Sequence, residues 1–108
     1  MSKYGNFKTE IDGIVFDSKH EATRYMELKY MERAGLIYDL QRQVKYELIP
    51  NIYEGKNVVQ RSASYIADFV YCRGGEKIVE DAKGVRTDVY KLKKKLMRWI
   101  HGIEIQEV

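Results

Sequence analysis

SYIADFVY (Ser64–Tyr71) and KIVEDAK (Lys77–Lys83) are the two stretches that decide the fold, and RGGE (Arg73–Glu76) lies between them. Both stretches have the residue pattern of β-strands. A Gly-Gly dipeptide tolerates the positive φ angles of a two-residue hairpin turn. The sequence therefore predicts an antiparallel hairpin in which Arg73 faces Glu76 and every further pair follows outward from them.

The predicted register places Val70 opposite Val79 and Asp68 opposite Asp81. Side chains alternate along a strand, so both aspartates and Lys83 are expected on one side of the sheet. Like charges directly opposite each other are unfavourable. Either a raised pKa of one carboxyl or a cation is needed to compensate, and Lys83 supplies only one positive charge.

The alternative is a solvated polar face, but Asp68 stands among apolar residues, where an unpaired acid is costly. Oxygen ligands favour Mg²⁺ or Mn²⁺ over zinc. Glu80 is expected on the opposite face, in a structural role. The pair Asp68 and Asp81 is thus a candidate metal site beside Lys83.

The remaining elements are read from turn residues, helix caps and periodicity. Asp12-Gly13 predicts a hairpin over residues 8–16. Ser18 and Gly35 bound a helix over 18–34, and Gly102 ends a second helix over 87–101. Residues 44–49 and 103–108 alternate as strands, whereas 36–43 are left as extended or irregular and 51–61 as an exposed loop.

The predicted C-terminal helix is amphipathic and basic. Its apolar residues are expected to face the core; they are Val89, Leu92, Leu96, Trp99 and Ile100. Residues 84–101 contain six basic residues and one acid, although the whole chain has a formal net charge of only +3. Such a local excess suits a polyanion such as nucleic acid, and a solvated helix face is the alternative.

The composition indicates a globular protein rather than a disordered or membrane-spanning one. With 108 residues, 44% of them hydrophobic, the chain suits one domain over 1–108. No apolar run is long enough to span a membrane, and the N-terminus lacks the apolar segment of a signal peptide. Cys72 is the single cysteine, so no internal disulfide forms and a reducing, cytoplasmic location is expected.

Several motifs together carry a family resemblance over nearly the whole chain. Asp68 followed by Asp81-Ala82-Lys83 looks like the PD-(D/E)XK nuclease signature, with Ala67 where that signature has proline. The chain resembles the DUF1064 family of small phage and prophage proteins, which is assigned to the same superfamily. The motifs that carry this resemblance are YGN, DGIVFDSKHEATRY, YIADFVY, VEDAKG and TDVYKLKKKL.

The resemblance implies an α/β fold, with a restriction-endonuclease-like mixed sheet in the order helix, strand, strand, strand, helix, strand. It also implies a Mg²⁺- or Mn²⁺-dependent nuclease. Asp68, Asp81 and the Ala82 carbonyl would hold the metal, and Lys83 would act on the attacking water and the phosphate. Glu21 would be a further catalytic or metal-binding residue, although Ser18 and Glu21 also form the pattern of a helix capping box.

DNA is the expected partner of a monomer or homodimer. Superfamily members often place the second helix against the DNA backbone. The residues expected there are Thr87, Tyr90, Lys91, Lys94, Lys95 and Arg98. The leading prediction is a structure-selective or non-specific phage endonuclease. A Holliday-junction resolvase acting as a dimer and a non-catalytic nucleic-acid-binding protein of the same fold are the alternatives.

Overall fold

The computed structural model describes residues 8–83 and 85–108, so Tyr4–Asn6 and Gly84 of the family motifs lie outside the described residues. The elements follow the order β1 (Thr9–Ile11), β2 (Ile14–Phe16), α1 (Lys19–Arg33), β3 (Tyr38–Ile49), β4 (Ile52–Glu54), β5 (Asn57–Gln60), β6 (Ala63–Arg73), β7 (Glu76–Asp81), α2 (Asp88–His101) and β8 (Gln106–Glu107). This mixed α and β architecture confirms the predicted fold class at that level.

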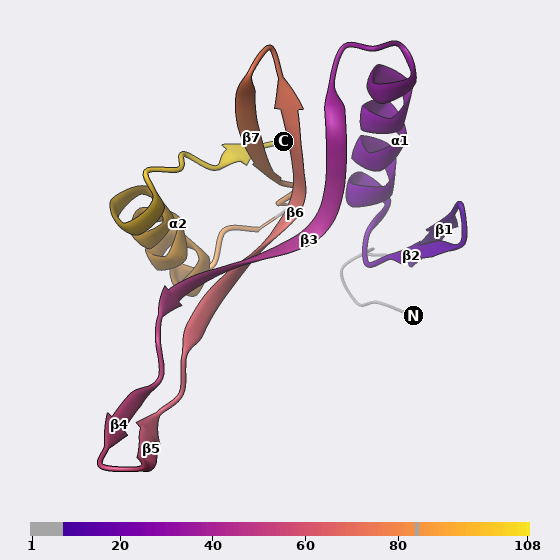
Figure 1. The fold of residues 1–108 in the computed structure, drawn as a ribbon. Helices are drawn as coiled ribbons and strands as arrows, with labels where there is room; N and C mark the ends of the chain where they lie inside the picture. Colours follow the sequence, from indigo (N-terminus) through magenta and orange to yellow (C-terminus); the bar gives the residue numbers. More distant parts are fainter. Residues whose placement is uncertain (1–7, 84) are drawn as a thin grey trace.

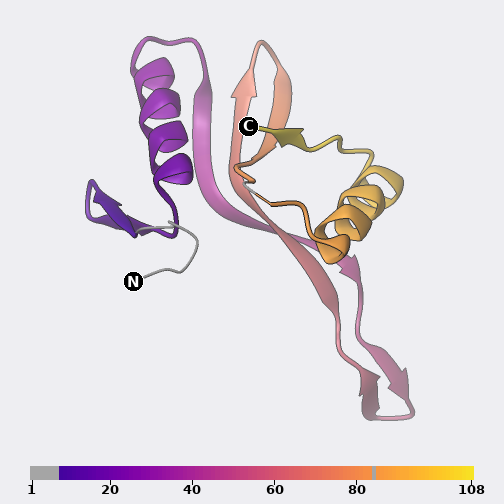
Figure 2. The same cartoon turned by 180° about the vertical axis from the view of Figure 1, so that it is seen from behind.

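A four-stranded mixed sheet in the order β3-β6-β7-β8 forms the centre of the protein. Strands β3, β6 and β7 are antiparallel neighbours, whereas β8 lies parallel to β7. Figures 1 and 2 show α1 and α2 on opposite sides of this sheet. The two helices therefore cover two separate cores, with the sheet as the shared middle layer.

Each core is dominated by side chains from one helix and the sheet face beneath it. The α1 side contains Leu28, Phe69 and Tyr71, all buried. The α2 side contains Val70 and Met97, both buried.

The turn and cap predictions are confirmed. Arg73 pairs with Glu76 and Val70 with Val79. Ser18 caps α1, because its Oγ accepts a hydrogen bond from the Glu21 N–H, and Gly102 ends α2 in the left-handed conformation at φ 66°. These features depend on residues that are close in sequence, which is why the sequence alone predicts them.

Three boundaries differ from the prediction. The strand expected from residue 44 begins already at Tyr38, and the expected loop over 51–61 contains the hairpin β4–β5. The final strand is limited to Gln106–Glu107. The sequence pattern does not predict the first part of β3, because Asp39 and Gln43 have left-handed backbones, at φ 58° and 52°. These two conformations interrupt the alternation of side chains along the strand.

The alternation also breaks in β6, at Asp68. Ala67 and Val70 pack in the α2-side core, whereas Phe69 packs in the α1-side core. Regular strand alternation predicts Ala67 and Phe69 on the same face, and the structure shows that this prediction is wrong. The break lies across from Gln43, between the pairs Arg42–Phe69 and Val44–Ala67.

The predicted inward face of α2 is wrong as well. Tyr90 and Met97 are the buried residues of this helix, whereas Trp99 is 83% exposed. Val89, Leu92 and Ile100 are exposed too. Leu96 is half-buried and packs against the core. The helix is thus rotated so that its apolar face only partly meets the sheet.

Candidate active site

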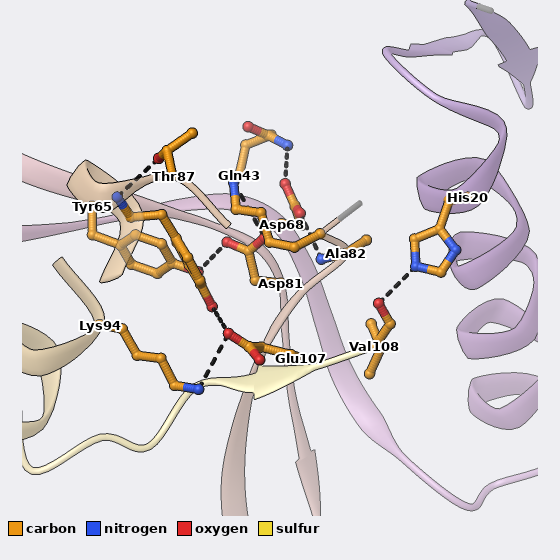
Figure 3. Close-up of polar contacts among 12 residues, drawn as sticks. His20, Gln43, Tyr65, Asp68, Asp81, Ala82, Thr87, Lys94, Glu107 and Val108 are labelled. Carbon is orange, nitrogen blue, oxygen red and sulfur yellow. Dashed lines mark hydrogen bonds and ion pairs between the residues drawn. The ribbon is translucent and has the colours of Figure 1, made fainter. Parts of the chain in front are cut away.

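The two aspartates come together where the β6–β7 ladder ends. The last paired residues are Phe69 and Glu80, immediately before Asp68 and Asp81. Asp68 Oδ2 accepts a hydrogen bond of 2.9 Å from the Ala82 N–H, and its Oδ1 lies 3.5 Å from Gln43 Nε2. Figure 3 shows Asp68, Asp81 and Ala82 gathered at this end of the strands.

Asp81 is almost completely buried, at 1% exposure. Its Oδ2 accepts a hydrogen bond from the Tyr65 hydroxyl. Its Oδ1 is buried without a hydrogen-bond donor among the described residues. Lys83 Nζ lies 3.5 Å from that oxygen as an ion pair, so the lysine is on the side of Asp81 that the sequence predicts.

The pKa of each aspartate is raised. For Asp81, burial is the main cause and the charge of Asp68 adds to it, against the lowering effect of the Tyr65 hydroxyl. For Asp68, burial is again the main cause; the Ala82 N–H lowers the pKa and the charge of Glu21 raises it. Ionising both groups together is costly, and a bound cation would offset that cost.

Glu21 reaches this site from α1. Its side chain is 12% exposed, and Oε2 lies 3.7 Å from Arg42 Nη2. Arg42 also lies over the Phe16 ring, with its guanidinium carbon 4.5 Å from the ring centre. The capping interaction uses the Glu21 backbone N–H, so the carboxylate is directed toward Asp68 and Arg42 while the helix is still capped by Ser18.

The donors present fit a magnesium-type site better than a zinc-type site. Among the described residues, no three His, Cys, Asp or Glu side chains are grouped so that they could hold a metal ion. Mg²⁺ binds through one or two carboxylates and keeps water or phosphate in its other positions. Asp68 and Asp81 supply the two carboxylates that such a site needs, and Asp81 Oδ1 accepts no hydrogen bond from the described residues, with Lys83 as its ion-pair partner.

A buried ion pair joins α1 to β7 directly beside the site. Arg24 donates from Nε to Glu80 Oε1 at 2.8 Å and from Nη2 to Oε2 at 2.6 Å. The Tyr71 hydroxyl also donates to Glu80, and burial together with the Glu80 charge raises the pKa of Tyr71 to about 12. Glu80 thus holds the helix that carries Glu21 against the strand that carries Asp81.

A basic groove lies next to the acids, on the α2 side of the sheet. Its volume is about 350 Å³, and it is lined by Arg86, Lys91, Lys94, Lys95, Arg98 and Glu107. Glu107 in β8 is paired with Asp81 in the adjacent parallel strand β7. The groove that Glu107 lines is therefore one strand away from the acid pair. Glu107 forms ion pairs with Arg86 at 2.8 Å and with Lys94 at 3.2 Å, and its pKa is lowered, first by the Tyr90 hydroxyl and then by Lys94.

The candidate DNA-contact residues differ in their placement. Lys91, Lys95 and Arg98 are exposed, and Lys94 is half-buried. Thr87 caps α2 by accepting the Tyr90 N–H at 3.1 Å. Tyr90 itself is buried, with its hydroxyl donating to Glu107 at 2.8 Å. The lysines and Arg98 are thus presented on the surface, whereas Tyr90 has a packing role.

Four residues at the site are absent from the sequence-based list of candidates: Gln43, Arg42, Tyr65 and Lys93. Lys93 lines a hollow of about 320 Å³ together with Lys83 and Thr87. The register between β3 and β6 brings Arg42 and Gln43 beside Asp68. Sequence analysis does not find these two residues, because it does not predict the part of β3 that contains them. Tyr65 precedes Asp68 by three residues, and only the break in alternation turns its hydroxyl toward Asp81.

Comparison with known proteins gives a family but no described activity. The family model "Protein of unknown function (DUF1064)" matches residues 1–104. Neither a curated protein nor a solved structure matches the chain.

Proposed function

The chain belongs to the DUF1064 family of proteins of unknown function, and from this premise we propose that it is a metal-dependent deoxyribonuclease. The observation that carries the proposal is the buried Asp81 Oδ1, which accepts no hydrogen bond from the described residues and has Lys83 Nζ 3.5 Å away as its ion-pair partner. An acid pair with raised pKa values next to a lysine and a basic groove is the arrangement expected for cleavage of a phosphodiester.

In this proposal Asp68, Asp81 and the Ala82 carbonyl hold Mg²⁺ or Mn²⁺, and Glu21 is a further ligand within reach. The bound metal would supply Lewis acidity and lower the pKa of a water molecule. No other protein ligand is required, because Mg²⁺ recruits substrate phosphate and water for the remaining positions.

The protein's own residues would position the substrate and stabilise charge. Lys83 lies 4.9 Å from the centre of the Tyr90 ring, so its ammonium is held next to the acids by the ring as well as by Asp81. It is proposed to orient the water and to stabilise charge that develops on the phosphate. Lys91, Lys94, Lys95 and Arg98 would hold the DNA backbone in the adjacent groove.

The order α1, β3, β6, β7, α2, β8 agrees with a restriction-endonuclease-like core, which we include in the proposal. A phage or prophage enzyme of the host cytoplasm, acting on DNA structure or without sequence preference, is the form proposed. A Holliday-junction resolvase would use the same residues in a symmetric dimer. A non-catalytic DNA-binding protein would use only the basic groove.

A cleavage assay with fluorescent duplex, single-stranded and four-way-junction DNA distinguishes these functions. Cleavage with Mg²⁺ or Mn²⁺ that stops with EDTA and in Asp81→Asn supports the nuclease. Paired cuts restricted to the junction indicate the resolvase. DNA binding without metal-dependent cleavage of any substrate would contradict both and leave the binding protein.

A further inference from the structure

The sequence predicts that the apolar residues of α2 face the core, but in the structure most of them are exposed. We call Val89, Leu92, Trp99 and Ile100 the apolar stripe. Their exposed fractions are 64%, 58%, 83% and 41%, respectively. Apolar residues at helical spacing normally face a core, and a contiguous exposed patch of this kind marks an interaction surface.

A second exposed apolar surface lies on the hairpin β4–β5, which we call the arm (residues 51–60). Every residue of the arm is exposed. Tyr53 and Val58 are partners in its ladder, so these two apolar side chains share one face; they are 56% and 46% exposed. The arm thus presents an apolar face that the described chain does not bury.

The arm also projects from the rest of the protein. Figures 1 and 2 both show it extending away from α2 and from the wide part of the sheet. The radius of gyration is 16.1 Å, whereas a compact domain of this length has about 13 Å. An isolated two-stranded hairpin is marginally stable in water and needs a helix or a third strand to pack against.

We propose that the arm of one copy packs on the apolar stripe of a second copy, forming a symmetric dimer. A helix can cover the Tyr53–Val58 face of the arm, and α2 has an apolar face that the described chain leaves exposed. In a dimer with a two-fold axis, the arm of each copy packs on the apolar stripe of the other copy, so both apolar surfaces are buried in both copies. A helix-to-helix pairing of the two stripes would leave both arms uncovered.

The area available agrees with that of a stable dimer. A half-exposed aliphatic side chain offers on the order of 50 Å², and an exposed tryptophan roughly 150–200 Å². The stripe together with the Tyr53–Val58 face therefore offers roughly 450 Å² of apolar area per copy. A standard interface buries about 800 Å² per partner, a little over half of it apolar.

The dimer leaves the basic groove accessible. Lys91 and Arg98 project from a different side of α2 than Leu92 and Trp99, at the angles set by 3.6 residues per turn, whereas Lys95 lies next to Trp99 at the border of the stripe. The proposal therefore does not depend on the nuclease function. A non-catalytic protein with this surface would dimerise in the same way.

The first experiment measures mass and fluorescence of the metal-free, DNA-free full chain over a range of concentrations. Sedimentation should give twice the 12.7 kDa of one chain at high concentration. Trp99 is the single tryptophan, so its emission should shift to the blue as the dimer forms. Trp99→Glu should weaken dimerisation at least ~30-fold, as expected for a central aromatic contact.

The matched control is Tyr30→Glu on α1, where the replaced aromatic side chain is 67% exposed. It should dimerise like the unsubstituted chain. Far-UV circular dichroism establishes that both variants fold, and Val58→Lys gives a second disruption from the arm. A chain that stays monomeric at all concentrations, or Trp99→Glu and Val58→Lys variants that dimerise normally, would overturn the proposal.

The second experiment identifies which surfaces meet. In a Cys72→Ser background, Leu92→Cys and Val58→Cys variants are mixed and oxidised. Disulfides between a Leu92→Cys chain and a Val58→Cys chain support arm-on-stripe packing. Disulfides formed only between identical variants would overturn arm-on-stripe packing. A chain that is monomeric and whose arm variants bind DNA more weakly would also overturn the proposal.

Discussion

Lys83 tests the chemistry of the proposed site most directly. Lys83→Ala should lower the cleavage rate by about 10²–10³-fold, the cost of removing one preorganised donor to a transition state. DNA affinity and metal affinity should change little, because the interaction is made mainly in the transition state. Single-turnover cleavage with DNA binding measured in parallel separates the two effects. Lys77→Ala, an exposed lysine of β7, the strand that precedes Lys83, is the control.

If Lys83→Ala and Asp81→Asn both cleave DNA at the unsubstituted rate, the chemistry does not occur at these residues. If Lys83→Ala loses DNA binding as well as cleavage, the lysine holds the substrate and does not act on the transition state.

Asp81 is required by the proposed chemistry, but burying its charge is expected to lower the stability of the fold. Its folded pKa is raised, so the folded state favours the protonated acid, and stability is lost as pH rises from the unfolded pKa through the folded one. Asp81→Asn should therefore have a higher Tm than the unsubstituted protein in metal-free buffer above that window. The difference should vanish below it. Mg²⁺ should raise the Tm of the unsubstituted protein only.

Thermal melts at several pH values with and without Mg²⁺ measure this. A Tm of Asp81→Asn that lies below that of the unsubstituted protein at neutral pH would mean that the Tyr65 and Lys83 contacts outweigh the cost of burying the charge.

At the scale of elements, the Arg24–Glu80 ion pair is what fixes α1 against β7. Arg24→Ala leaves the buried Glu80 carboxylate with the Tyr71 hydroxyl but without its guanidinium partner, and breaking a buried ion pair costs about 3–5 kcal/mol. Adding Glu80→Gln should recover part of that loss, because the neutral amide costs less to bury. Urea unfolding measures both variants. Arg33→Ala, an exposed arginine of the same helix, should have little effect. Equal stability of Arg24→Ala and Arg33→Ala would contradict this role.

The basic side of α2 is tested through the salt dependence of DNA affinity. Lys94 and Arg98 lie within ion-pairing distance of Glu107 and Glu104, whereas no ion pair joins Lys91 or Lys95 to an acid within residues 8–83 and 85–108. Replacing Lys91 and Lys95 with alanine should reduce the slope of log K against log salt by about 1.8, or 0.9 per phosphate contact. The double variant Lys45→Ala, Lys77→Ala removes the same charge elsewhere. An equal slope change in both would indicate a general charge effect.

The elements differ in how far the sequence predicts them, for physical reasons. The Gly74-Gly75 turn sets the β6–β7 register locally, and helix caps depend on residues a few positions apart. The left-handed backbone of Gln43 has no such local signal, since glycine would be the expected residue there. The break in alternation that turns Tyr65 toward Asp81 is consequently visible only in the structure.

The apolar stripe of α2 illustrates a second limit. Periodicity predicts that Leu92 and Trp99 are covered, but it cannot say by which chain. The acid pair is predictable for the opposite reason, because the hairpin turn that sets its register lies only a few residues away.

At the scale of the whole molecule, β6 contributes to both cores. Phe69 and Tyr71 pack under α1, whereas Ala67 and Val70 pack under α2. Loss of β6 would therefore expose apolar surface on both sides of the sheet at the same moment. The two layers should unfold together, in a single transition.

Amide hydrogen exchange gives this feature a measurable consequence. Strand β6 has neighbours on both edges, so its central N–H groups should exchange only through global opening, at the slowest rates in the chain. The N–H groups of β4 and β5 should exchange by local fraying and much faster. Under native conditions, the amides of Phe69 and Val70, which belong to different cores, should report the same opening free energy. Unequal values would mean that the layers on either side of the sheet open as separate cooperative units.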